Sequence, residues 1–170
     1  MVWCENVPAI VMITRLLEKS CPKCEAYFPT GKDESCKYGE ISVTVQSIQI
    51  KGGYVIRKLD VQFGSPEVQE PQEMVSSASV SFSEPTVGTK RQGPVVVHCS
   101  AGVGRTGCFI AISLGCSQLR ETNNVDVLGI VSRMRCDRGG MVQSAEQYEC
   151  IHRALALFEQ FLQISSLGDP

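Results

Sequence analysis

The chain has 170 residues, and 16 basic against 18 acidic side chains give it a formal net charge of −2 at neutral pH. This length predicts one domain with one sizeable core. The acidic balance argues against nucleic-acid binding, which needs a basic surface. The sequence lacks a run of 18 apolar residues, and Glu5 and Arg15 interrupt its apolar start, so neither a membrane span nor a signal peptide is predicted. Nine unevenly spaced cysteines are typical of reduced thiols, so we expect a cytoplasmic protein.

Three runs in the first third of the chain predict β-strands. Residues 8–14 are apolar and rich in β-branched side chains, which is typical of a buried strand. Residues 41–49 and 54–63 alternate apolar and polar side chains, and the Lys-Gly-Gly sequence between them favours a turn. We therefore expect these two runs to form a hairpin.

Residues 65–93 differ in composition from the rest of the chain. They are rich in Ser, Glu, Gln and Pro, and their apolar residues are scattered. Long segments without regular structure are uncommon inside compact domains. We expect an irregular, mobile insert that divides the single domain, 1–170, into a sheet segment, 1–63, and a C-terminal part, 94–164.

The C-terminal part predicts a strand, a glycine-containing loop and three helices. Residues 94–98 form a continuous apolar run typical of a buried strand. Helical periodicity follows in three segments: 106–120, 125–135 and 144–161. Asp126 and Ser144 precede the second and third helices and belong to the residue types that cap helix starts.

The sequence VHCSAGVGRTG spans the junction between this strand and the first helix. Backbone N–H groups from Ser100 to Arg105, unobstructed at Gly102 and Gly104, can converge on an anion, and the helix dipole adds to their field. The same field favours a thiolate at Cys99. The planar fork of Arg105 can hold two phosphoryl oxygens, which a lysine cannot do. The predicted phosphate contacts are the residues of this loop: Cys99, Ser100, Ala101, Gly102, Val103, Gly104 and Arg105.

Two residues beside the loop extend the predicted chemistry. The hydroxyl of Thr106 can donate to the Cys99 sulfur, and His98 can orient the loop from behind. The alternative for Cys99 is a buried structural thiol, and for Arg105 a surface charge. Chance would bring this set of residue types together at fixed offsets in fewer than about one chain in a thousand, so we expect a catalytic site. The sequence contains neither a Walker loop nor a GxSxG elbow.

The motif HCSAGVGRTG resembles the signature of the tyrosine-specific protein phosphatases, which normally reads HCSAGIGRTG. LLEKSCPKCEAYFP at 16–29 resembles a second loop of that family, and DRGGMVQSAEQY at 137–148 resembles its glutamine loop. Details such as GCFIAISLGC resemble the cytosolic haematopoietic and striatum-enriched subgroup. The resemblance implies an α/β fold class, with a central mixed β-sheet flanked by helices.

The resemblance also implies roles for residues outside the phosphate-binding loop. In the segment 16–29, Glu18 would pair with Arg105, Lys23 would lie near the rim of the site, and Tyr27 would support His98.

In the glutamine loop, Gln143 would position the hydrolytic water and Gln147 would assist it. The implied reaction is hydrolysis of phosphotyrosine on proteins through a cysteinyl-phosphate intermediate, with no metal and no other cofactor. The substrates of the resembled subgroup are MAP kinases, which are therefore the implied partners.

Two departures from the family pattern weaken the implied activity. Family members carry a Trp-Pro-Asp loop upstream of the nucleophile, and its aspartate protonates the leaving oxygen. Here the only tryptophan is Trp3, residues 61–98 hold no aspartate, and Glu84 is the nearest substitute. The chain also begins inside the family's domain. We therefore expect an N-terminally truncated form that is slow, because general acid catalysis contributes about a hundred- to ten-thousand-fold.

Two other interpretations remain. The missing aspartate favours a catalytically disabled phosphotyrosine binder or decoy, and the missing front of the domain favours an unfolded product. Dual-specificity phosphatases and arsenate reductases share the bare Cys-x5-Arg loop, but the flanking motifs argue against both.

Further residues have simpler interpretations. Cys21 and Cys24 form a CxxC pair, but a zinc site needs two more ligands and no second pair is present. We expect His152 to be packed or exposed rather than a catalytic base. Arg135 and Arg138 are either solvated charges or contacts at the rim of the anion site. Core packing is expected for three helical cysteines: Cys108, Cys116 and Cys136.

Overall fold

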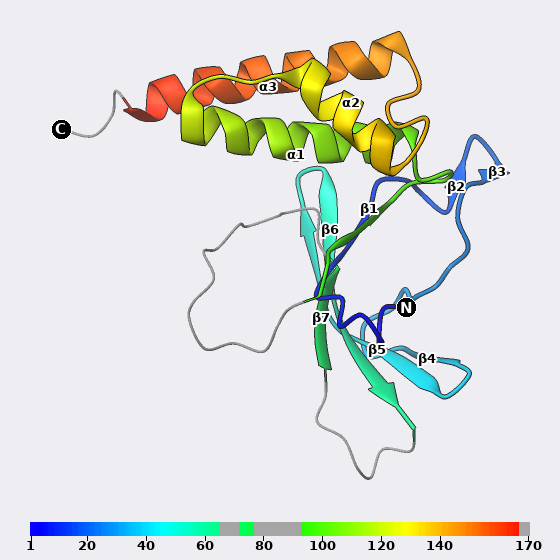
Figure 1. Ribbon diagram of the computed structural model, residues 1–170. Coiled ribbons are helices and arrows are strands. Elements are labelled where there is room, and N and C mark those ends of the chain that lie inside the picture. The colour runs from blue at the N-terminus through cyan, green and yellow to red at the C-terminus, as the bar shows by residue number, and fades with distance from the viewer. Residues whose placement is uncertain (65–71, 77–92, 167–170) are drawn as a thin grey trace. The chain divides into compact units, whose positions relative to one another are not determined.

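The computed structural model describes residues 1–64, 72–76 and 93–166 (Figure 1). The chain divides into two compact units, Met1–Val97 and His98–Pro170. Strands make up the first unit and helices most of the second, and the boundary falls within the strand β8. The α/β fold class expected from the sequence is confirmed.

The described strands form three sheets rather than one. One two-stranded sheet pairs β1 (Ile10–Met12) with β8 (Val96–His98), and another pairs β2 (Leu17–Glu18) with β3 (Cys21–Pro22). The third sheet is antiparallel and has the order β4-β5-β6-β7. Its strands are β4 (Ser35–Tyr38), β5 (Ile41–Lys51), β6 (Tyr54–Phe63) and β7 (Gln72–Ser76).

The hairpin predicted between residues 41 and 63 is confirmed. β5 and β6 pair antiparallel from Ile41 opposite Phe63 to Lys51 opposite Tyr54. Gly53 takes a φ of 125°, a backbone conformation that is unfavourable for residues with a side chain, so this turn requires glycine. The register shifts once, between Val45 and Ser47, as a β-bulge would cause.

The core of the first unit lies under this hairpin. Alternate side chains of β5 and β6 point to one face, as strand geometry requires, and apolar residues from the start of the chain cover them. Trp3 stacks on Phe63 at a ring-centroid distance of 6.0 Å. The buried core residues are Val7, Ile10, Val43, Val45, Leu59 and Val61.

The segment 65–93 was expected to be irregular, and the structure differs from that expectation at one place. Residues 72–76 form β7, which pairs with β6 from Arg57 opposite Ser76 to Val61 opposite Gln72. The rest of the expectation lies outside the described residues, apart from Gly93, whose N–H donates to the carbonyl of Asn6 at 3.0 Å.

Three helices form the second unit: α1 (Gly104–Thr122), α2 (Val127–Asp137) and α3 (Ala145–Ser166). They match the three predicted helical segments. The predicted caps are also confirmed, because the side chain of Asp126 accepts from the Gly129 N–H at 2.8 Å and the Ser144 hydroxyl accepts from the Gln147 N–H at 3.3 Å. Asn123 ends α1 in the left-handed conformation, with a φ of 55°.

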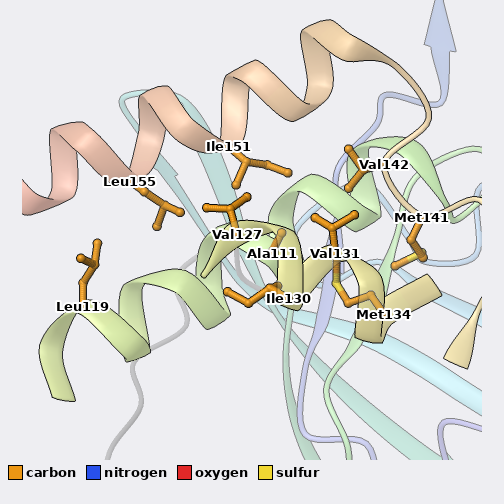
Figure 2. Close-up of a cluster of buried hydrophobic side chains, with 10 residues drawn as sticks. All are labelled: Ala111, Leu119, Val127, Ile130, Val131, Met134, Met141, Val142, Ile151 and Leu155. Atoms are coloured by element: carbon orange, nitrogen blue, oxygen red, sulfur yellow. The ribbon is translucent and has the colours of Figure 1, made fainter. Parts of the chain in front are cut away.

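The helices share one core, in which side chains from all three point toward one another (Figure 2). Gly115 lets α1 approach α3 closely, since a methyl group there would lie 2.7 Å from a methyl carbon of Leu155. The core continues into the loop before α3, so the helices also hold that loop in place. The buried members are Ala111, Leu119, Val127, Ile130, Val131, Met134, Met141, Val142, Ile151 and Leu155.

The three helical cysteines do not share one environment. Cys108 and Cys116 are partly buried against the helical core, as expected. Cys136 is exposed, so its predicted core packing is wrong. It follows the buried Met134 by two positions, which places it about 200° around the helix, on the solvent side. All nine cysteines are free thiols.

Within the described residues, no helix is both long and apolar enough to cross a membrane.

Candidate active site

The loop between β8 and α1 turns the backbone around the Cys99 side chain. Cys99 is 7 % exposed and lies directly after the last strand residue. Gly102 adopts a φ of 70°, which favours glycine, and α1 begins two residues later at Gly104. Val103, at the N-cap position, offers no side-chain cap, so the first N–H groups of α1 remain available to an anion.

The loop stabilises the Cys99 thiolate. Burial alone would raise the pKa of Cys99, but hydrogen bonds from the hydroxyl and N–H of Thr106 and from the N–H groups of Gly102 and Val103 outweigh it. The pKa of Cys99 falls from its ordinary 9.0 to about 7. Three backbone N–H groups therefore converge on the sulfur, as expected for an anion-binding nest.

Thr106 lies on the first turn of α1 and is 3 % exposed. Its buried hydroxyl oxygen has no well-aligned hydrogen-bond partner among the described residues. The same hydroxyl lowers the pKa of Cys99, although burial of the sulfur opposes it. A buried hydroxyl left wholly unpaired would be costly, and the Cys99 sulfur is the acceptor beside it.

Gln143 and Gln147 lie over the end of the loop. A methyl carbon built on Gly104 would lie 2.9 Å from Oε1 of Gln143 and 2.7 Å from Nε2 of Gln147. Gly104 is buried, so these two carboxamides close directly over its backbone. The predicted convergence of the two glutamines with the phosphate-binding loop is therefore seen in the geometry, while their roles stay predictions.

A backbone hydrogen bond connects the chain segment before Gln143 to the phosphate-binding loop. The carbonyl of Val103 accepts from the N–H of Gly107 at 3.0 Å and from the N–H of Val142 at 3.2 Å. A methyl group on Gly107 would lie 2.6 Å from the Val142 nitrogen, so glycine is needed for this close approach. The glutamine loop and the phosphate-binding loop are thus in direct contact.

The two arginines of this region have different contacts. Arg138 reaches the phosphate-binding loop only weakly, with Nη2 3.5 Å from the carbonyl oxygen of Ala101. Arg135 instead binds the glutamine loop, donating from Nε to the Met141 carbonyl at 2.9 Å and from Nη2 to the Val142 carbonyl at 2.8 Å. From the sequence, only a rim or solvated position was predicted for Arg135, and this pair of bonds was not expected.

Three other candidates lie within the same unit. Nδ1 of His98 is 3.0 Å from the Cys99 carbonyl oxygen, which accepts a hydrogen bond in the tautomer that carries its proton on Nδ1. Arg105 is exposed on the first turn of α1, close in sequence to the sulfur it is predicted to serve. His152 is exposed and packs against Tyr148 at a ring-centroid distance of 4.9 Å, which agrees with its simpler interpretation.

The remaining candidates belong to the first unit. Glu18 accepts hydrogen bonds from the Thr14 hydroxyl and the Arg15 N–H at 3.1 and 3.2 Å. The Lys23 N–H donates to the carbonyl of Leu16, and Tyr27 packs edge-on against Phe28. Burial raises the pKa of that tyrosine to about 12. Their predicted relations to the catalytic residues stay predictions.

Among residues 1–64, 72–76 and 93–166, no group of three His, Cys, Asp or Glu side chains could hold a metal ion. Cys21 is exposed and Cys24 is half-buried. The groups that lower the pKa of Cys99 are backbone N–H groups and the Thr106 hydroxyl.

The fold, the loop and its cysteine define a class of protein. A family model described as protein-tyrosine phosphatase matches residues 1–80 and 66–157, which is most of the chain. The chain belongs to the protein-tyrosine phosphatase family.

The chain is similar to individual phosphatases of both the receptor and the non-receptor type. The chain is 43 % identical to human receptor-type tyrosine-protein phosphatase R, over 98 % of this chain and 27 % of that protein. It is 41 % identical to human tyrosine-protein phosphatase non-receptor type 7, over 93 % of this chain and 47 % of that protein. It is 36 % identical to rat tyrosine-protein phosphatase non-receptor type 5, over 98 % of this chain and 48 % of that protein. The chain therefore spans between a quarter and a half of these relatives, and its likeness extends to a receptor-type protein.

Proposed function

We propose that this chain hydrolyses phosphotyrosine on proteins through a cysteinyl-phosphate intermediate. The observation that carries the proposal is the convergence of three loop N–H groups on the buried Cys99 sulfur, which lowers the pKa of this thiol against its burial. The thiolate attacks phosphorus, an S–P bond forms, and the P–O bond to the tyrosine oxygen breaks. Loop N–H groups and the Arg105 fork hold the three other oxygens as charge spreads over them.

The second step returns the enzyme to its starting state. Water attacks phosphorus, the S–P bond breaks, and the Cys99 thiolate leaves with inorganic phosphate released. The Thr106 hydroxyl stabilises the departing sulfur, which its contribution to the lowered pKa of that thiol supports. The carboxamide of Gln143 orients the water, supported by its place over Gly104 beside the loop.

The first step is slow for a poor leaving group. A tyrosine oxygen needs a proton as it departs, and residues 61–98 contain no aspartate to supply one. General acid catalysis contributes about a hundred- to ten-thousand-fold, so we propose impaired turnover of phosphotyrosine. An activated aryl phosphate, whose leaving group needs little protonation, should escape most of this loss.

The same missing aspartate favours a second candidate function. A loop that binds the phosphoryl group but releases the alcohol too slowly would act as a phosphotyrosine binder that shields its target. The built loop supports binding in either case, so the two functions differ only in turnover.

The physiological setting is proposed from the sequence resemblance. The resembled subgroup implies MAP kinases as phosphotyrosine substrates and a cytoplasmic location. Binding of a nucleic acid or a membrane is not proposed, because the net charge of −2 gives no broad basic field.

Burst kinetics with 2,4-dinitrophenyl phosphate tests the proposal. A competent Cys99 releases close to one equivalent of phenol per chain rapidly and then turns over more slowly, whereas Cys99→Ser gives neither phase. Paired measurement with a phosphotyrosine peptide separates the candidates, since a binder gives saturable binding without phosphate release. Equal rates for the parent and Cys99→Ser would remove this cysteine from the mechanism.

A further inference from the structure

The peptide unit that joins Val142 to Gln143 is held at both ends. Its carbonyl oxygen accepts from Nη2 of Arg135 at 2.8 Å, and its N–H donates to Oε1 of Gln147 at 2.7 Å. A peptide unit is planar, so fixing its oxygen and its nitrogen fixes the plane. The plane contains the N–Cα bond of Gln143, so it fixes the bond from which this residue and its side chain extend.

The backbone at Val142 needs such support. Its φ is 61°, a conformation that β-branched residues rarely adopt, and its side chain is 2 % exposed in the helical core. Strained conformations of this kind persist only where the surroundings hold them. Its N–H is held by the Val103 carbonyl of the phosphate-binding loop at 3.2 Å, and its carbonyl is held by Arg135.

The guanidinium of Arg135 suits this task because it makes two bonds at once. Nε binds the Met141 carbonyl while Nη2 binds the next carbonyl along the chain, which uses the fixed geometry of the fork. Charge-assisted hydrogen bonds of this kind are roughly twice as strong as neutral ones. A lysine at the same position could not reproduce both bonds with one orientation.

We infer that Arg135 is a positioning residue for the water-attack step, acting through the Val142–Gln143 peptide unit. The inference rests on the proposed function, because it gives a cause for the place that Gln143 takes over Gly104. Since Oε1 of Gln143 lies only 2.9 Å from the Cβ position of Gly104, turning this peptide unit would move the carboxamide away from the loop. A displacement of about 1 Å in a catalytic group can cost a hundredfold in rate.

The test compares Arg135→Gln and Arg135→Lys with the parent chain, and Arg133→Gln is the matched control. Arg133 is an exposed arginine of the same helix, about 200° around its axis from the positioning residue. The substrate is 2,4-dinitrophenyl phosphate, so formation of the cysteinyl phosphate is fast and its hydrolysis limits turnover. Rapid-quench measurement gives the burst, and steady-state rates give kcat and KM.

We expect the two Arg135 variants to keep the parent burst and the parent kcat/KM. Their kcat and KM should fall together by about tenfold, because only the step after phenol release is slowed. Arg133→Gln should match the parent. A fall in kcat/KM equal to the fall in kcat would instead indicate general damage to the loop and overturn the inference. Full activity of Arg135→Lys would overturn the role of the fork.

Hydrogen exchange distinguishes failure of this inference from failure of the proposed function. We expect the Val142 and Gln143 amides to exchange about tenfold faster in Arg135→Gln than in the parent, because their peptide units lose an anchor. A parent without a burst would contradict the proposed function, and the exchange rates would then still test the positioning. Unchanged exchange at these two amides overturns the inference whatever the kinetics show.

Discussion

The strand pairing in the first unit and the Cys99 site in the second differ in how far apart along the chain their contacting residues lie. In the first unit, the Val96 N–H donates to the Ala9 carbonyl, so the pairing of β1 with β8 joins positions 87 residues apart. In the second unit, the groups that lower the pKa of Cys99 against its burial all lie within seven residues of it. Chemistry that is encoded locally can be read from a motif, whereas closure of a sheet across a long intervening segment cannot.

The largest expected effect on the free energy of unfolding comes from a large-to-small substitution in the helical core. Ile151 is fully buried, so Ile151→Ala should lower the free energy of unfolding by about 2–5 kcal/mol. The measurement is urea unfolding followed by far-UV circular dichroism. Ile164→Ala on the same helix, where the side chain is 70 % exposed, is the matched control and should change stability by less than about 0.5 kcal/mol.

A partner variant in the first unit sharpens the comparison. Val45 is also fully buried, and Val45→Ala should cost about 2 kcal/mol in the sheet. Because the groups that stabilise the Cys99 sulfur lie in the other unit, the pH dependence of its alkylation should not change. If the pKa of Cys99 rises in Val45→Ala, the site depends on the sheet of the first unit, which would contradict the idea that the site is built from neighbouring residues alone.

The next effect tests the contact between the two loops of the helical unit. Gly107→Ala should destabilise the protein by about 1–3 kcal/mol, because the new methyl group would meet a backbone nitrogen at 2.6 Å. In an open helix the same change would be stabilising by roughly 0.5–1 kcal/mol. Gly139→Ala, which meets nothing within 4 Å, should be close to neutral in the same thermal melt. A stabilised Gly107→Ala would show that these loops are not packed together.

The comparison also explains what could be predicted from the sequence. The caps Asp126 and Ser144 and the hairpin around Gly53 depend on neighbours within a few residues, and all were predicted. β4 was not predicted, although Gly39, with a φ of 65°, separates it from β5 by a two-residue turn that the sequence Tyr-Gly-Glu-Ile could have indicated. β7 was missed because its sequence is polar and its strand character depends on pairing with β6.

Within the candidate site, side-chain direction was the harder part. The resemblance brought Gln143 and the phosphate-binding loop together, but nothing in the spacing of Arg135 indicated that its guanidinium turns back to two carbonyls. Such a bond depends on the path of the chain after the helix, including the positive φ of Val142, which residue type argues against. Cys136, by contrast, could have been placed from the helical phase of its neighbours.

The third effect is the reactivity of Cys99. Its pKa of about 7, against an ordinary 9.0, means about a hundredfold more thiolate at pH 6. A less basic thiolate is intrinsically less nucleophilic, so we expect a net advantage of about tenfold over free cysteine in alkylation by iodoacetamide. The rate should level off above about pH 7. Burial raises the pKa of Cys116, so this helical thiol is the internal comparison and should react more slowly.

The same titration predicts how pH changes stability. The folded protein favours the thiolate, so this contribution is fully present above about pH 9 and is lost as pH falls toward 7. Thr106→Val removes a hydroxyl that stabilises the thiolate and should shift the inflection of alkylation to higher pH. An unshifted inflection would leave the backbone N–H groups as the only cause of the lowered pKa.

The smallest expected effect is at the start of α2. Asp126→Ala removes the acceptor of the Gly129 N–H and should cost about 1 kcal/mol, within the usual range for a cap. Asp137→Ala at the other end of the helix is the matched control, and it should be neutral or slightly stabilising because an acidic group opposes the helix dipole there. Differential scanning calorimetry resolves both changes. Since α2 carries Arg135, loss of this cap should also speed hydrogen exchange at the Gln143 amide. If Asp126→Ala destabilises the helix and leaves that exchange rate unchanged, the stability of α2 does not control the position of the glutamine loop.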